Sequence, residues 1–199
     1  MLREDDISPD PFEQFARWYR EAAADPRADA MALATATADG APSVRFVLLK
    51  GLDRRGFVFF TNYESRKGRE LAGNPRAALA WYWSHEGPGR QVRVTGPVER
   101  LSQEESEAYW RTRPRESQLA ASTSRQSEAI AGRDDLEAEY AGLAAAFEGR
   151  DVPLPPTWGG FRLEPEVIEF WQHGEHRLHD RLQYTRRPDG TWRIERLAP

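Results

Sequence analysis

The stretch E-F-W-Q-H-G-E-H-R-L-H-D-R, residues 169–181, crowds cationic and aromatic side chains together. It holds three of the four histidines of the chain, two arginines and a tryptophan. In an extended strand, alternate side chains share a face, so Arg177, His179 and Arg181 would point the same way. Guanidinium groups stack on flat rings and hydrogen-bond to ring oxygens. The row therefore indicates either a solvated basic edge or a site for a planar anionic ligand.

A second pair of cations, Arg45 and Lys50, bounds the run R-F-V-L-L-K. Five strand steps separate them, roughly 16 Å at about 3.3 Å per residue. An odd number of steps also places them on opposite faces of a regular strand. They are either ordinary strand-end cations or two anion contacts at opposite ends of a long ligand.

Arg66 and Lys67 follow Ser65 at the expected start of a helix. The N-terminal end of a helix favours anions, so two cations there oppose the helix dipole unless an anion neutralises them. This pair therefore indicates a bound phosphate.

Three further side chains are of types that bind phosphate. Tyr109, Arg113 and Ser117 offer a phenol, a guanidinium and a hydroxyl group. An exposed helix end explains the trio nearly as well. The serine-rich stretch around Gln126 and Ser127 supplies further donors or forms a flexible surface loop.

The composition excludes several other kinds of site. The chain has 199 residues, a formal net charge of -4 and no cysteine, which excludes disulfides and thiolate chemistry. No basic excess favours nucleic acid, and no H-E-x-x-H or comparable spacing indicates a metal. No apolar run is long enough to span a membrane, and the acidic start M-L-R-E-D-D is unlike a signal peptide. We expect a cytoplasmic protein without nucleic-acid, membrane or metal partners.

The remaining sequence predicts the elements that position these residues. Asp10, Pro11 and Glu13 begin a helix over about 10–24. Further helices are expected at 65–72, 102–113 and 134–147, with a loop over 118–127. Strands are expected at 30–37, 43–50, 56–62, 76–83, 90–100, 159–163, 167–171, 176–184 and 191–196. Sequential antiparallel strands with a few peripheral helices predict one domain, residues 1–199, of α+β class, mainly β, that forms a small β-barrel.

Taken in order, eight motifs of the chain resemble those of the pyridoxamine 5′-phosphate oxidase family. They are R-F-V-L-L-K, F-F-T-N-x-x-S-R-K, R-Q-V-R-V, R-P-R-x-S-Q, S-R-Q-S, W-G-G-F-R, E-F-W-Q and R-L-H-D-R. The resemblance runs from about Asp10 to the terminal R-L-A-P. It implies an FMN-binding split β-barrel with peripheral helices, in which strands from about 159 to 196 complete the site. It also implies a homodimer with one non-covalent FMN per subunit at the subunit interface.

The resemblance further implies a role for each matching residue. The FMN contacts would be Arg45, Phe46, Val47, Leu48, Leu49, Lys50, Phe60, Thr61, Arg66, Lys67, Gln91, Gln126, Ser127, Trp171 and Arg181. The substrate contacts would be Lys50, Tyr109, Arg113, Ser117, Arg177, Leu178 and His179. Of these, Arg177 and His179 would act next to the reacting carbon.

The family oxidises pyridoxine or pyridoxamine 5′-phosphate to pyridoxal 5′-phosphate by hydride transfer from C4′ to the flavin, and O₂ becomes H₂O₂. This chain departs from the family pattern at its N-terminus, which lacks an R-x-x-Y segment, and at Ala120 and Ser122, where glycine and tryptophan are usual. The altered stretch is similar to phenazine-biosynthesis flavin oxidases. An FMN oxidase of another aromatic substrate is therefore one alternative, and a non-enzymatic flavin- or haem-binding split barrel is the other.

Overall fold

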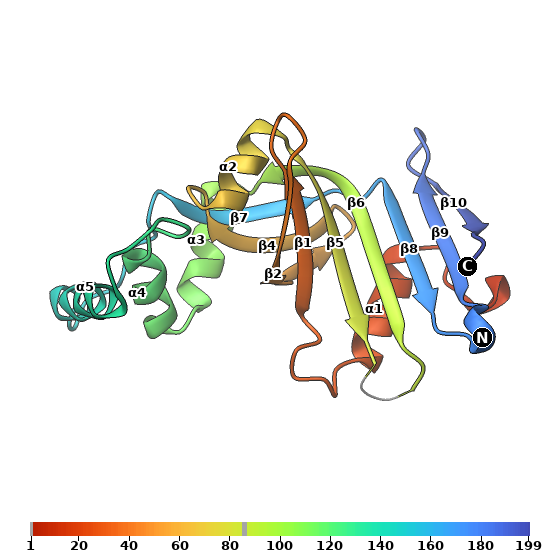
Figure 1. Cartoon of the computed structure of the whole chain (residues 1–199), viewed down its shortest axis with the longest axis horizontal. Helices are drawn as coiled ribbons and strands as arrows, with labels where there is room; N and C mark the ends of the chain where they lie inside the picture. The colour runs from red at the N-terminus through yellow and green to blue at the C-terminus, as the bar shows by residue number, and fades with distance from the viewer. Residues whose placement is uncertain (1, 85–86) are drawn as a thin grey trace.

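The computed structural model describes residues 2–84 and 87–199, in which a large antiparallel sheet is flanked by helices (Figure 1). The strands are β1 (Ala30–Ala36), β2 (Pro42–Leu48), β3 (Gly51–Asp53), β4 (Gly56–Asn62), β5 (Arg76–Trp83), β6 (Arg90–Arg100), β7 (Trp158–Leu163), β8 (Val167–Gln172), β9 (Asp180–Arg186) and β10 (Trp192–Arg196). The helices are α1 (Pro11–Glu21), α2 (Arg66–Gly73), α3 (Gln103–Thr112), α4 (Arg115–Thr123) and α5 (Arg133–Ala146).

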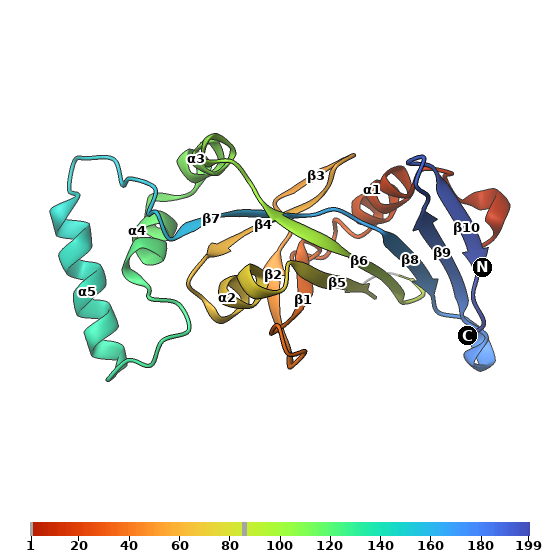
Figure 2. The ribbon, with the colours of Figure 1, turned by 90° about the horizontal axis from the view of Figure 1, so that it is seen from above.

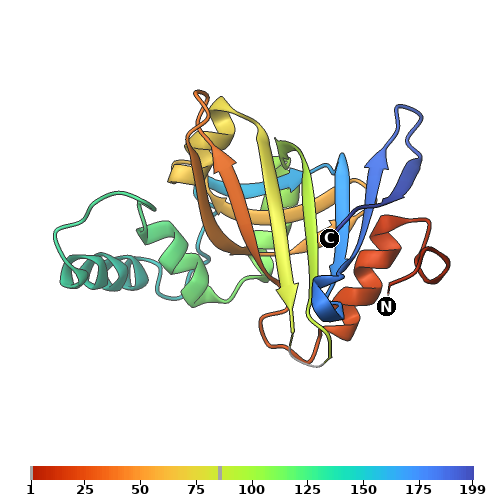
Figure 3. The same cartoon turned by 45° about the vertical axis from the view of Figure 1, so that its right-hand side comes forward.

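The sheet is continuous but folds back on itself. Its main path runs β10-β9-β8-β6-β5-β1-β2, and the end of β6 also pairs with β7, which pairs with β4 and through it reaches β3. Strands β4 and β7 therefore cross behind the main path, as Figures 1 and 3 show. This bend closes one side and leaves the other open, so the expected mainly β split barrel is confirmed.

The inner face of the main path carries the core. Strand register places Leu33 beside Leu79, Leu79 beside Val94 and Val94 beside Ile168 on this face, and all four are buried. Helix α1 covers it: the ring of Phe15 lies 4.9 Å from that of Trp81, centroid to centroid.

Helix α1 begins where the sequence predicts. The Asp10 carboxylate accepts the N–H of Phe12, and Pro11 occupies the first turn. The helix ends at Glu21 rather than near 24, because Ala22 and the residues after it form turns.

The outer face of the same sheet is lined by small side chains and by exposed apolar ones. Directly paired residues point to the same side of a sheet, so Phe46, Ala32 and Ala80 share this face. Val44 and Phe46 of β2 are 69% and 76% exposed, and Tyr82 of β5 is 61% exposed. The outer face is thus smooth and apolar along β1, β2 and β5.

A helical lobe projects at one end of the molecule, opposite β9 and β10 (Figure 2). It packs around Trp110, Leu119, Val152 and Trp158. The expected helix near 102–113 is confirmed with a capping box formed by Ser102 and Glu105. The prediction of a loop over 118–127 is wrong in its first half, because α4 continues to Thr123 and buries Leu119 against the lobe.

The expected strand over 176–184 is also wrong in its first part, since β9 begins only at Asp180. Glu175–Arg177 form a short 3-10 turn, in which His176 and Arg177 have φ angles of 53° and 65°. The amide N–H of Leu178 closes the turn on the carbonyl of Glu175. Arg177 and His179 therefore do not share a strand face with Arg181.

Candidate functional site

The start of α2 gathers the cations expected to meet a phosphate. Ser65 caps the helix by accepting the N–H of Gly68, and the amide of Arg66 donates to the hydroxyl of Ser127 at 3.2 Å. The Arg66 side chain is 61% exposed, so its guanidinium faces solvent. The expected helix start at Ser65 is confirmed, and residues 66 and 127 meet although they lie far apart in the chain.

Lys67 lies behind Arg66 and is buried. Its Nζ donates to Gln126 Oε1 at 2.7 Å, to Thr61 Oγ1 at 3.1 Å and to Ser65 Oγ at 3.2 Å. Burial, with the nearby charge of Arg45, lowers the pKa of Lys67 to about 8. Because all three ammonium protons have partners, Lys67 can contact a ligand only by exchanging one of them.

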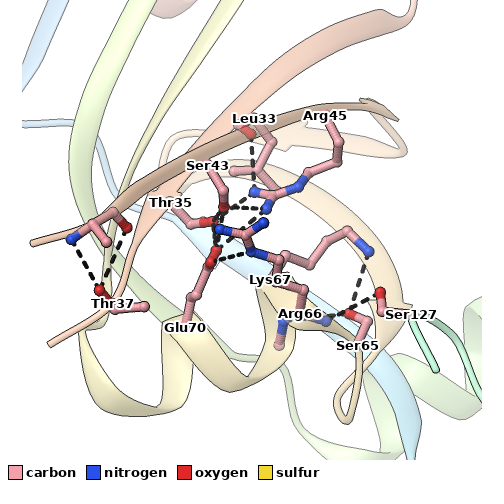
Figure 4. Close-up of polar contacts among 12 residues, drawn as sticks. Leu33, Thr35, Thr37, Ser43, Arg45, Ser65, Arg66, Lys67, Glu70 and Ser127 are labelled. Carbon is pink, nitrogen blue, oxygen red and sulfur yellow. Dashed lines mark hydrogen bonds and ion pairs between the residues drawn. The ribbon is translucent and has the colours of Figure 1, made fainter. Parts of the chain in front are cut away.

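Arg45 reaches the same place from β2. Its guanidinium donates to the carbonyl of Leu33 at 3.1 Å and forms an ion pair with Glu70 at 3.2 Å. Glu70 also accepts from Arg66 at 2.9 Å (Figure 4). We call Arg45, Arg66, Lys67 and Glu70 the Glu70 cluster.

A second group, the Arg113 cluster, consists of Phe60, Tyr109, Arg113 and Trp158. The ring of Tyr109 stacks on that of Phe60 with centroids 3.9 Å apart. The Arg113 guanidinium lies 4.5 Å from the Trp158 ring centroid and donates to the carbonyl of Ser117 at 2.9 Å. Burial lowers the pKa of Arg113, so its charge lacks full solvation. The expected trio of Tyr109, Arg113 and Ser117 therefore does come together.

The two clusters are joined in sequence through β4, where consecutive side chains point to opposite faces. Phe60 belongs to the Arg113 cluster, and the next residue, Thr61, bonds to Gln126 and Lys67. Lys50 lies apart: its Nζ pairs with Asp29 at 2.9 Å, and no contact in the described residues joins it to Tyr109 or Arg113.

The remaining residues of the run 46–49 alternate between the two faces. Phe46 and Leu48 are exposed on the outer face, whereas Leu49 is buried and Val47 packs on the core. Contacts of Val47 and Leu49 with a flavin could therefore use only their backbone.

A row of expected flavin contacts crosses the outer face at the other end of the sheet. Gln91 pairs with Trp171, and Trp171 pairs with Arg181. The Nε of Arg181 donates to Glu169 at 2.9 Å, and its Nη1 donates to the carbonyl of Ala198 at 2.8 Å. Burial would raise the pKa of Glu169, but hydrogen bonds from Arg181 and Arg93 lower it overall. Glu169 therefore stays ionised and holds Arg181 in place.

Residues 173–181, which we call the C-terminal arm, follow this row. The imidazole of His179 lies 4.7 Å from the Trp171 ring and 5.3 Å from that of His173, centroid to centroid. Its Nδ1 accepts the N–H of Gly174 at 3.2 Å. A side chain at Gly174 would place Cβ 2.1 Å from the carbonyl oxygen of Leu178, so only glycine permits this tight turn. Arg177 is exposed, and Leu178 is 71% exposed.

The expected flavin contacts are therefore divided within one chain. Arg45 on β2 and Arg181 on β9 are separated by five strand-to-strand steps, roughly 24 Å at about 4.8 Å per step. Arg45 also lies on the inner face, beside Leu33, whereas Arg181 lies on the outer face. No contact within the described residues joins Arg45 to Arg181.

Four residues near these sites were not among the expected contact residues, although Trp158 and Glu169 lie within matched motifs. Glu70 follows Arg66 by one helical turn, a spacing that the sequence does show. Trp158 and Glu169 acquire partners only through tertiary packing. Gly174 has an unexceptional φ of -124°, so its role is visible only from the close approach of Leu178.

The described residues hold neither a membrane-spanning helix nor a metal-binding group of side chains. Within residues 2–84 and 87–199, no helix is long and apolar enough to cross a membrane. The same residues contain no group of three or more histidine, aspartate or glutamate side chains that could hold a metal ion.

Two family profiles together match nearly the whole chain. The family profile described as pyridoxamine 5′-phosphate oxidase matches residues 18–145. The profile described as the pyridoxine 5′-phosphate oxidase C-terminal dimerisation region matches residues 158–199. A pyridoxine/pyridoxamine 5′-phosphate oxidase of Rubrobacter xylanophilus is 58% identical over 100% of this chain and 91% of its own length. One from Cupriavidus necator is 53% identical over 100% of this chain and 93% of its own.

Solved structures with the same fold include PhzG from Burkholderia lata 383, in complex with tetrahydrophenazine-1-carboxylic acid. It is 36% identical, with a TM-score of 0.92, over 100% of this chain and 98% of that one. A pyridoxamine 5′-phosphate oxidase-related, FMN-binding protein of Nostoc punctiforme is 19% identical, with a TM-score of 0.74, over 93% of this chain and 95% of that one. The first agrees in sequence and fold, and the second in fold alone. This chain therefore belongs to the pyridoxamine 5′-phosphate oxidase family of oxidoreductases.

Proposed function

We propose that this protein uses FMN to oxidise pyridoxine 5′-phosphate and pyridoxamine 5′-phosphate to pyridoxal 5′-phosphate, with O₂ reduced to H₂O₂. For the amine substrate, water supplies the aldehyde oxygen and ammonia leaves. The observation that carries the proposal is the presence of two cationic clusters joined through β4, the Glu70 cluster and the Arg113 cluster. A phosphorylated cofactor and a phosphorylated substrate need one each. Relatives named for this activity match the chain over its full described length.

The Glu70 cluster fits the phosphate of FMN in its donor chemistry. It presents the exposed guanidinium of Arg66 at a helix N-terminus, with Lys67 and the hydroxyls of Ser127 and Thr61 beside it. Guanidinium, ammonium and hydroxyl groups are the usual phosphate donors. When bound, FMN would supply the ring that accepts the hydride and returns electrons to O₂.

The Arg113 cluster would hold the phosphate of the substrate. Arg113 is held between Trp158 and the carbonyl of Ser117, so its guanidinium is fixed before the ligand arrives. Its lowered pKa reflects incomplete solvation of the charge, which a phosphate would offset. Tyr109 would donate its phenol to the same phosphate, and Lys50 would join by leaving Asp29.

The C-terminal arm would act on the reacting end of the substrate. Because Nδ1 of His179 accepts the N–H of Gly174, the neutral imidazole carries its proton on Nε2. His179 would therefore donate a hydrogen bond to the substrate rather than accept its proton. Arg177, exposed on the turn, would close over the substrate ring, and Leu178 would pack beside it.

A homodimer would unite the two halves of the site. The exposed apolar side chains Val44 and Phe46 of β2 and Tyr82 of β5 lie on the outer face, on which the row that holds Arg181 also lies. Pairing two such faces about a two-fold axis would bring the arm of each subunit to the Glu70 cluster of the other. Each dimer would then hold two equal FMN sites, one non-covalent FMN per subunit.

A direct test is anaerobic mixing of the FMN-loaded dimer with each B6 phosphate in turn. The proposal predicts that the flavin is bleached by both phosphates and recovers its colour when O₂ is admitted, with release of H₂O₂. Unphosphorylated pyridoxine is the matched control and should bleach it far more slowly. A flavin that stays oxidised with every compound tested would indicate a binding protein.

A second candidate is oxidation of a phenazine precursor. It is favoured by the 36% identity to PhzG and by Ala120 and Ser122 of α4, which replace the glycine and tryptophan expected for the family. Tetrahydrophenazine-1-carboxylic acid should therefore be included among the substrates. Bleaching by this compound alone, with none by the B6 phosphates, would replace the first proposal with the second.

A further inference from the structure

We infer that Glu70 is a positioning residue for the cofactor phosphate, acting through Arg45 and Arg66. The inference deepens the proposed function and rests on it, because it takes the Glu70 cluster as the FMN phosphate site. Neither the family motifs nor the expected contact residues include this carboxylate.

The geometry places Glu70 at the centre of a network from three elements (Figure 4). Its Oε2 accepts from the hydroxyls of Thr35 on β1 and Ser43 on β2, and from Arg45 on β2. Its Oε1 accepts the Nε–H of Arg66 on α2 at 2.9 Å. The carboxylate side chain is only 4% exposed. It therefore links β1, β2 and α2 from inside the protein.

The sequence positions these groups by simple local rules. Thr35 and Ser43 are directly paired across β1 and β2, so their hydroxyls lie side by side on one face. Arg66 and Glu70 are one helical turn apart. The single carboxylate can thus reach both strands and its own helix.

The carboxylate is ionised under all ordinary conditions. Burial by itself would raise the pKa of Glu70, but hydrogen bonds from Ser43, Thr35, Arg66 and Arg45 lower it to about 2. One negative charge faces the three cations Arg45, Arg66 and Lys67. The surplus of positive charge suits a phosphate monoester, which carries about -1.5 to -2 at neutral pH.

Glu70 has two opposing effects on a phosphate bound at Arg66. Its charge repels the phosphate, whereas its hydrogen bonds fix the two guanidiniums and reduce their mutual repulsion. Glu70 is buried behind the arginines, and the exposed fork of Arg66 is the part that meets the ligand. Fixing a long side chain before binding removes an ordering cost that otherwise weakens affinity. We therefore expect the positioning effect to dominate.

The test compares FMN with riboflavin, which has the same ring but no phosphate. Glu70→Gln in the full-length dimer should weaken FMN binding about tenfold, from the ordering cost of two arginine side chains, and leave riboflavin binding unchanged. The matched control is Glu166→Gln, which removes an exposed ion pair with Arg76 and should alter neither affinity. Flavin fluorescence during titration of the apoprotein gives both constants.

A double-mutant cycle with Arg66→Ala shows whether Glu70 acts through that arginine. In the Arg66→Ala background, Glu70→Gln should have much less effect on FMN binding than in the wild type. If Glu70→Gln does not fold, Ser43→Ala removes one of the hydrogen bonds to the carboxylate and should weaken FMN binding in the same phosphate-dependent way.

Four results would overturn the inference: tighter FMN binding in Glu70→Gln, unchanged FMN binding in that variant, equal weakening of FMN and riboflavin, or full additivity with Arg66→Ala. The proposed function fails by a different result. If wild-type protein binds FMN no better than riboflavin, the Glu70 cluster is not a phosphate site, whatever the variants do. If the wild-type protein oxidises B6 phosphates and Glu70→Gln binds FMN as tightly as the wild type, only the role of Glu70 is removed and the proposed function stands.

Discussion

The Glu70 cluster and the C-terminal arm are the two regions expected to meet the ligands, and they are built in opposite ways. In the cluster, Glu70 and Lys67 are buried and each bonds to several partners. In the arm, Arg177 is exposed on a turn with φ of 65°, and Leu178 beside it is 71% exposed. One region is complete within its subunit, whereas the other presents its side chains outward.

This difference indicates a division of labour. An anchor for a phosphate gains from groups that are fixed before binding. Groups that close over a reacting ring must instead reach beyond their own subunit, and the exposed turn allows that. The comparison therefore predicts that the Glu70 cluster and the C-terminal arm of one active site come from different chains.

The largest effect is expected from separating the two chains. Phe46→Glu places a carboxylate on the apolar outer face and should give a folded monomer that loses FMN and nearly all oxidase activity. Sedimentation and flavin content are the measurements. Ile130→Glu, at another exposed apolar residue far from this face in the sequence, is the control and should leave the dimer intact. A folded Phe46→Glu monomer that retains FMN would disprove the shared site.

A mixed-dimer experiment sharpens the comparison further. Arg113→Ala changes the Arg113 cluster, which β4 joins to the Glu70 cluster, and Arg177→Ala changes the C-terminal arm. Each should lower kcat/KM about 100-fold, since each removes charged hydrogen bonds. In a dimer with one chain of each kind, a shared site would have both defects and its counterpart neither.

Random mixing of the two variants should therefore restore about a quarter of wild-type activity, because half the dimers are mixed and each has one intact site. Arg111→Ala, two residues away and exposed, should behave like wild type. Activity that stays at the level of the parents after mixing would mean that each site lies within one chain.

A smaller effect is expected at Gly174. Its replacement by alanine places Cβ 2.1 Å from the Leu178 carbonyl oxygen, so the arm must shift and His179 loses its partner. We expect Gly174→Ala to lower kcat/KM about thirtyfold, within the usual cost of overpacking, with FMN binding unchanged. Gly142→Ala, where nothing lies within 4 Å of the added Cβ, is the control. Loss of FMN in Gly174→Ala but not in Gly142→Ala would show that the C-terminal arm is needed to hold the cofactor.

The smallest effect is a pH dependence of FMN binding at the Glu70 cluster. The pKa of Lys67 is lowered to about 8, so the ammonium loses its proton as the pH rises through that value. FMN affinity should then fall about fivefold between about pH 7 and about pH 8.7, by linkage. The unliganded fold should change in the opposite sense and gain stability from pH 8 towards the ordinary pKa of 10.5, because the unfolded chain retains the proton there.

Lys67→Arg keeps its charge throughout this range and is the matched control, since its FMN affinity should stay level. A wild-type affinity that does not vary with pH would show that Lys67 makes no charged contact with the cofactor.

Local signals in the sequence were sufficient to place the helix that carries most of the Glu70 cluster. Ser65 predicts the start of α2, and Ser102 with Glu105 predicts the start of α3, because a cap depends only on neighbouring residues. The motif also named Lys67, but not its burial or its bonds to Gln126, which depend on a loop far along the chain.

Local signals failed for the arm. Alternation of residues predicted a strand through Arg177 and His179, but the turn is set by a bond between the Gly174 backbone and the His179 side chain. Strand periodicity carries no information on such a bond. Helix α4 was missed for a related reason: Leu119 is its only buried residue, so no apolar period marked it. The division of site residues between two faces needed strand register, which the sequence does not state.

Both chain ends meet beside Arg181. The N–H of Leu2 donates to Asp180, the guanidinium of Arg196 donates to the carbonyl of Leu2, and Arg181 donates to the carbonyl of Ala198. Two of these contacts join residues 178 and 194 positions apart in the sequence. The Glu70 cluster, built from residues 33–127, can fold while later segments are still being synthesised, whereas the strand that holds Arg181 needs residues 196–198 to be present. We therefore expect subunits to pair, and the two sites to form, only after residue 198 has been synthesised.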